Sequence, residues 1–94
     1  MRIDLLLKYL CLVKTRSMGK KGCEKGRIKI NGLAVKPAGE CRAGDVLEIR
    51  YPHRILVAEL LEEPGGQVSR KESAKYLRII REINLDREEG GWDA

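Results

Sequence analysis

The stretch TRSMGKKGCEKGRIKINGLAVK, residues 15–36, contains the signals of a short basic helix. Thr15 or Ser17 can cap the helix N-terminus, because a side-chain hydroxyl accepts a hydrogen bond from a backbone N–H of the first turn. Gly26 can adopt the left-handed conformation that ends a helix, so the helix is predicted to stop near Lys25. Two interior glycines lower its propensity, which predicts a helix held mainly by packing.

A further helix is predicted before this stretch, over residues 3–13. Its apolar residues recur at the three- and four-residue spacing of one buried face. They are Ile3, Leu6, Leu7, Leu10 and Val13. Asp4 is expected to pair with Lys8 one turn later. The cations Arg2, Lys8 and Lys14 are expected on the solvent-facing side, where they are candidates for binding.

A hairpin is predicted directly after the basic helix. Ile28-Lys29-Ile30 alternates in polarity as a strand does, and residues 33–35 can return beside it. Asn31-Gly32 between them is a strong signal for a two-residue hairpin turn. Residues 46–51 and 54–61 are also predicted strands. The predicted fold is therefore α+β, with two N-terminal helices packed on a small, curved antiparallel sheet.

The C-terminal third is predicted to be an addition to this fold. The first domain is expected to cover residues 1–61, followed by a linker over 62–68 that contains proline and glycine. Ser69-Arg70-Lys71-Glu72 has the spacing of a capping box, and the apolar residues after it predict an amphipathic helix over 69–84. Residues 85–94, with Trp92, are acidic and are predicted to be a disordered tail.

Positive charge is concentrated at the N-terminal end of the chain. Residues 1–36 contain ten Lys or Arg and two acids, a net charge of +8, whereas residues 37–94 contain nine Lys or Arg and twelve acids, a net charge of −3. Such segregation favours a polyanionic partner. RNA is favoured over DNA, because the helix after Thr15 is too short for major-groove reading. A solvated basic surface without a partner would give the same counts, so charge alone leaves that alternative open.

The sequence offers little for catalysis or cofactor binding. His53 is the only histidine, and no Ser or Cys nucleophile is patterned around it. Cys11, Cys23 and Cys41 lack the close spacing of zinc ligands, so no metal or other cofactor is expected. We interpret them as free thiols of a cytoplasmic protein, because the apolar run Leu5 to Val13 is interrupted by a lysine and lacks an export cleavage site.

Together the motifs resemble the RNA-binding domain named after ribosomal protein S-four. They are Arg2-Ile3-Asp4, Thr15-Arg16-Ser17 at the start of the second helix, Gly-Arg-Ile-x-Ile-Asn-Gly at Gly26 to Gly32, Lys36-Pro37, and Gly44-Asp45 before a hydrophobic strand. The chain is similar in particular to the stand-alone heat-shock protein fifteen and RqcP group, which acts in bacterial ribosome-associated quality control. It departs from the pattern at Gly19, Gly22 and Cys23, where alanine or larger aliphatic residues are usual.

The resemblance implies that two helices and the hairpin form one RNA-binding surface. It implies a non-enzymatic adaptor that contacts rRNA and tRNA on free large ribosomal subunits obstructed by peptidyl-tRNA, and that supports C-terminal tailing of the stalled chain by a larger partner. We expect no membrane partner and a monomer off the ribosome. The candidate RNA-binding residues are Arg2, Lys8, Lys14, Arg16, Ser17, Lys20, Lys21, Lys25, Arg27, Lys29, Asn31 and Lys36, with Arg2 and Arg16 leading. The alternative is a general binder of structured RNA or tRNA that acts in ribosome assembly or stress response.

Overall fold

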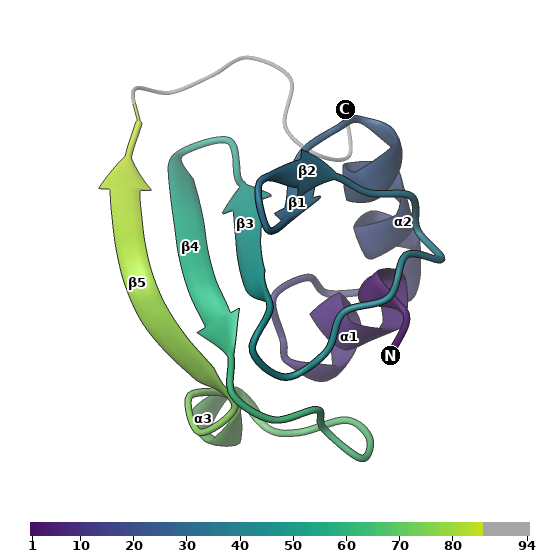
Figure 1. The fold of residues 1–94 in the computed structure, drawn as a ribbon, viewed down its shortest axis with the longest axis vertical. Coiled ribbons are helices and arrows are strands. Elements are labelled where there is room, and N and C mark those ends of the chain that lie inside the picture. The colour runs from purple at the N-terminus through teal and green to yellow at the C-terminus, as the bar shows by residue number, and fades with distance from the viewer. Residues whose placement is uncertain (86–94) are drawn as a thin grey trace.

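A computed structural model of the protein describes residues 1–85. In chain order its elements are α1 (Ile3–Tyr9), α2 (Arg16–Glu24), β1 (Ile28–Ile30), β2 (Leu33–Ala34), β3 (Val46–Arg50), β4 (Arg54–Leu60), α3 (Arg70–Ser73) and β5 (Leu77–Asn84). The strands form one antiparallel sheet in the order β2-β1-β3-β4-β5. Helices α1 and α2 lie beside β1, and β5 forms the far edge (Figure 1). The predicted α+β class is confirmed.

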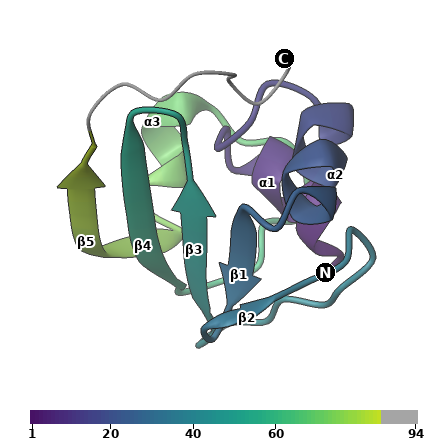
Figure 2. The same cartoon turned by 90° about the horizontal axis from the view of Figure 1, so that it is seen from above.

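The core lies between α1 and one face of the curved sheet (Figure 2). The predicted apolar stripe is buried at all five of its positions, from Ile3 to Val13. Alternate strand residues face it, because successive side chains of a strand point to opposite faces. These buried strand residues are Ile28, Ile30, Leu47, Ile49, Leu56, Ala58, Leu60 and Leu77. The helix predicted over 3–13 is right in its buried face but too long, since α1 ends at Tyr9 and Cys11 takes a positive φ of 60°.

Helix α2 is capped at both ends. Thr15, rather than Ser17, is the N-cap, and its hydroxyl accepts a hydrogen bond of 3.1 Å from the backbone N–H three residues on. At the other end Gly26 has a φ of +72°, and the Arg27 N–H donates to the Gly22 carbonyl at 2.9 Å, as in a Schellman motif. These caps fix the limits of a helix whose interior glycines weaken it.

The hairpin turn forms at Asn31-Gly32 as predicted, with positive φ values of 51° and 83°. The Asn31 side chain also joins the hairpin to β3, because its Nδ2 donates to Asp45 Oδ1 at 3.1 Å and its Oδ1 accepts from the Val46 N–H at 2.9 Å. Hydrogen bonds from the Arg42 N–H and from Asn31 lower the pKa of the Asp45 carboxyl group. The turn residue thus has a structural role at this end of the sheet.

The predicted C-terminal helix over 69–84 is wrong beyond its first turn. The capping box forms, since the Ser69 hydroxyl accepts a hydrogen bond from the Glu72 N–H at 3.1 Å, but α3 ends at Ser73. Leu77–Asn84 is the strand β5, which pairs with β4. The physical reason is that β4 offers a free edge of backbone donors and acceptors, and the three isoleucines of this segment suit a strand.

Through β5 the C-terminal segment belongs to the same sheet as the hairpin strands β1 and β2. The Leu85 N–H donates to the His53 carbonyl at 2.8 Å just beyond it. The division into a domain over 1–61 and a linker over 62–68 stays a prediction. The predicted tail, apart from Leu85, lies outside the described residues.

The three cysteines differ in exposure. Cys23 and Cys41 are buried, and burial raises the pKa of Cys23 to about 11 and that of Cys41 to about 12. At neutral pH both are therefore protonated and poor nucleophiles. We expect iodoacetamide to modify the half-buried Cys11 first in the folded protein, and the other two only after unfolding. Peptide mass spectrometry measures this order, and equal labelling of all three in the native protein would contradict it.

Candidate nucleic-acid interface

A cluster of charges joins α1 to α2. Asp4, in the first turn of α1, has a side chain only 3% exposed, and its carboxylate accepts hydrogen bonds from Arg2 Nη2 at 3.1 Å and Arg16 Nε at 3.4 Å. It also accepts the Leu5 N–H at 2.8 Å. The two arginine side chains are about half exposed, 47% for Arg2 and 48% for Arg16. One buried carboxylate therefore holds two arginines that still face solvent.

This Arg2–Asp4–Arg16 cluster is suited to binding phosphate. A guanidinium has five N–H donors in a planar fork, and Asp4 uses only some of them. The remaining donors can form bidentate, charge-assisted hydrogen bonds to phosphate oxygens. Because Asp4 already fixes the direction of both side chains, less rotamer freedom is lost when a ligand binds.

The predicted pairing of Asp4 with Lys8 is wrong. The Asp4 carboxylate is occupied by the two arginines and the Leu5 N–H. Lys8 turns away and its Nζ donates to Gln67 Oε1 at 3.0 Å. A buried carboxylate gains more from two guanidinium groups than from one flexible ammonium group, because the planar donors match both of its oxygens.

Gly19 allows α2 to come close enough for this cluster to form. A Cβ atom at Gly19 would lie 3.0 Å from the backbone oxygen of Asp4 and 3.5 Å from Leu7 Cδ1. The glycine lowers the helix propensity of α2 but permits close backbone approach between the two helices.

Replacing Gly19 with alanine should separate the helices slightly. The gain in helix propensity is about 1 kcal/mol, and overpacking against backbone costs about 1–3 kcal/mol, so a net loss of about 1 kcal/mol is expected. Urea unfolding of G19A beside G65A measures it, because a Cβ at Gly65 meets nothing within 4 Å. Stabilisation of G19A would show that the helices have room to spare.

Four other predicted residues lie on α2 or in the loop beside the start of α1. Ser17, Lys20 and Lys21 are exposed on α2, and Lys20 is one turn beyond Arg16 on the same side of the helix. Lys36 is exposed in the loop after β2. That loop contacts the start of α1, since the Asp4 N–H donates to the Pro37 carbonyl at 3.3 Å and the Ile3 N–H to the Gly39 carbonyl at 2.8 Å.

The remaining predicted residues lie elsewhere. Lys8 and Lys14 line a hollow to which Arg2, Asp4 and Arg16 do not contribute. Lys29 is on β1, where its Nζ is 3.9 Å from Glu48 Oε2 on β3. Asn31 is engaged with β3 as described above. Lys25 and Arg27, at the C-terminal end of α2 and just before β1, both already take part in interactions.

Sequence reasoning missed the role of Asp4. The signal was present, because an acid in a segment of net charge +8 that folds into the core needs cationic partners. It also missed that Arg54 and Arg70 join Lys8 and Lys14 around one hollow. No local pattern marks that arrangement, since the residues come from four separate segments.

The fold agrees with comparisons to known proteins. The family model for the S4 domain matches residues 1–47, which include α1, α2 and the hairpin. This defines the class as an RNA-binding S4 domain. The RQC P-site tRNA stabilizing factor of Listeria monocytogenes is 36% identical over 86 residues, 92% of each chain. The factor of the same name from Streptococcus pneumoniae is 31% identical over 86 residues, 92% of this chain and 97% of that one.

The chain belongs to this family of RQC P-site tRNA stabilizing factors. A solved structure also has a similar fold. The trimeric structure of heat shock protein 15 from Vibrio cholerae has a TM-score of 0.80, with 23% identity over 84% of this chain and 80% of that one. At this identity the agreement concerns the fold.

Proposed function

We propose that this protein binds RNA on the large ribosomal subunit and stabilises the P-site tRNA during ribosome-associated quality control. The observation that carries the proposal is the Arg2–Asp4–Arg16 cluster, two pre-oriented arginines on the most basic part of the chain. The names of its relatives support the same role.

In this proposal the protein acts by positioning RNA. Arg2 and Arg16 hold phosphate groups, while exposed Lys20, Lys21 and Lys36 add charge around them. The N-terminus of α2 contributes backbone N–H groups and a favourable dipole beside Arg16. Contacts to rRNA and to tRNA from one small domain would keep the tRNA in place between rounds of chain addition.

The finer parts of the proposal concern partners and location. We propose a non-enzymatic adaptor that is monomeric off the ribosome, works in the cytoplasm, and supports a larger tailing factor on subunits obstructed by peptidyl-tRNA. No helix among residues 1–85 is long and apolar enough to cross a membrane.

Co-sedimentation with purified large subunits tests the proposal. The protein is mixed with empty subunits or with subunits that carry peptidyl-tRNA, and its distribution across a gradient is measured at several salt concentrations. Preferential binding to the obstructed subunits is expected. Equal affinity for empty and obstructed subunits would favour the general RNA-binding alternative. If the protein does not co-sediment with either preparation even at low salt, both the proposal and this alternative are contradicted.

A further inference from the structure

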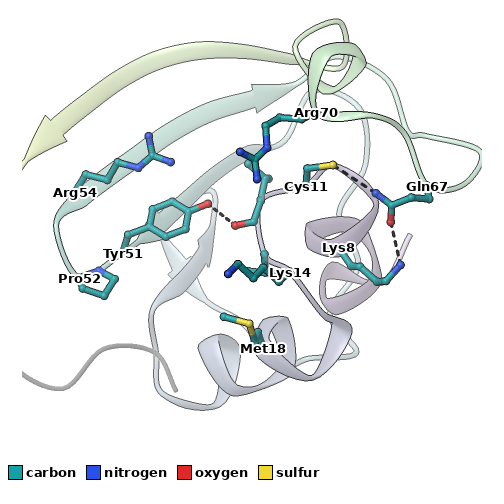
Figure 3. Close-up of a pocket in the computed structure, with 11 residues that line it drawn as sticks. Lys8, Cys11, Lys14, Met18, Tyr51, Pro52, Arg54, Gln67 and Arg70 are labelled. Atoms are coloured by element: carbon teal, nitrogen blue, oxygen red, sulfur yellow. Dashed lines mark hydrogen bonds between the residues drawn. The ribbon is translucent and has the colours of Figure 1, made fainter. Parts of the chain in front are cut away.

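A hollow of about 820 Å³ is lined by none of the three residues of the Arg2–Asp4–Arg16 cluster. Figure 3 shows residues from several segments facing it: Lys8 and Cys11 from the end of α1 and the turn after it, Lys14 and Met18 from the chain before α2 and its first turn, Tyr51 and Arg54 from the β3–β4 turn and the first residue of β4, and Gln67 and Arg70 from the chain before and within α3. Its volume lies in the range of small-molecule sites, so it can admit a nucleotide-sized group.

The charge of the hollow has one sign. Lys8, Lys14, Arg54 and Arg70 are among its lining residues, and none of the lining residues is Asp or Glu. Within residues 1–85, the side chains of Lys14 and Arg70 have no hydrogen-bond or ion-pair partner. The Arg54 guanidinium also forms an ion pair with Glu82 of β5. Four cations around one concavity focus a positive potential on its interior.

The floor of the hollow is apolar and includes an aromatic ring. Leu12, Val13, Met18 and Tyr51 contribute to it. The Tyr51 hydroxyl donates to the Leu12 carbonyl at 2.6 Å, which fixes the ring against the helical layer (Figure 3). The Arg54 guanidinium lies 4.8 Å from the Tyr51 ring centre. A fixed ring with a thioether and a stacked guanidinium nearby suits the face of an unstacked base.

We propose that this hollow binds an unpaired segment of RNA, with phosphates held by Lys14 and Arg70 and a base placed over the Tyr51 and Met18 side. RNA is favoured over an acidic peptide because the floor is apolar and aromatic, and because Met18 lies on the same helix as Arg16. A strand that leaves a helical RNA held at the cluster could continue into the hollow. The inference rests on the proposed function in that both sites would hold parts of the same bound RNA.

Binding of the full-length protein to two RNAs tests this inference. One is a short hairpin, and the other is the same hairpin with a single-stranded uridine extension. We expect the extension to tighten binding of the wild type about tenfold, and K14A/R70A to lose that gain while it binds the plain hairpin as well as a control variant that lacks two cations outside the hollow. With two single-strand phosphate contacts removed, the slope of log affinity against log salt should fall by about 1.4 for the extended RNA.

The matched control is K71A/K75A, which removes two exposed cations from outside the hollow. The inference would be overturned if K71A/K75A lost the gain in affinity from the uridine extension as fully as K14A/R70A. It would also be overturned if the extension added no affinity to the wild type. A polyglutamate peptide that binds the wild type but not K14A/R70A, with extended-RNA binding unchanged, would assign the hollow to acidic peptides instead. If the wild type binds the plain hairpin and obstructed subunits yet ignores the extension, only this inference fails and the proposed function stands.

Discussion

R16A is expected to bind obstructed large subunits at least about tenfold more weakly than the wild type. Arg16 is half exposed and held by Asp4, so its free donors are directed outward before RNA arrives. A hydrogen bond to a charged group contributes about 1.5–3 kcal/mol, which corresponds to a roughly ten- to hundredfold change in affinity. The loss should appear as a reduced bound fraction in gradients of large subunits and as a salt slope lower by about 1.

The matched control for R16A is K75A, which also removes one exposed cation but lies beyond α3. Loss of nonspecific attraction alone would weaken both variants equally. A specific contact predicts that K75A keeps near wild-type affinity at physiological salt. Equal behaviour of the two variants would remove Arg16 from the interface. Thermal unfolding of both variants separates weaker binding from weaker folding.

Elements with local signals could be predicted from the sequence. The caps of α2 depend on Thr15 and Gly26, and the hairpin depends on Asn31-Gly32, so nearby residues determine each of them. The stripe of α1 was predictable because one buried face repeats along a single helix. The fold class followed from these elements in order.

Features that depend on distant partners could not be predicted in this way. Leu77, Ile80 and Ile83 fit a helical spacing, but pairing with β4, which lies about twenty residues earlier, makes the segment a strand. The register also shifts between Val57 and Ala58, so neither simple period describes the strand pair. The partners of Asp4 follow from the approach of α2 at Gly19, which is a tertiary contact.

D4N is expected to weaken both folding and RNA binding. The asparagine side chain keeps the shape of the carboxylate but lacks the negative charge that Arg2 and Arg16 share. Its NH₂ group would also face the N–H donors of a guanidinium, where no hydrogen bond can form. Removing charge-assisted hydrogen bonds at a buried site costs about 2–3 kcal/mol. For a chain of this size that is a fall in melting temperature of roughly 10 °C or more. Urea and thermal unfolding measure this part of the effect.

The direction of the change in RNA affinity separates positioning from simple electrostatics. Removing a negative charge from a basic surface should tighten RNA binding if only the net charge matters. If Asp4 orients Arg2 and Arg16, D4N should instead bind about tenfold more weakly. In this variant the two guanidinium groups are no longer held by a carboxylate, so their side chains must be ordered when RNA binds. The comparison is made where D4N is fully folded, beside L56A, a buried β4 variant of similar instability that leaves the cluster intact. Tighter binding by D4N than by L56A would show that the buried carboxylate serves only the fold.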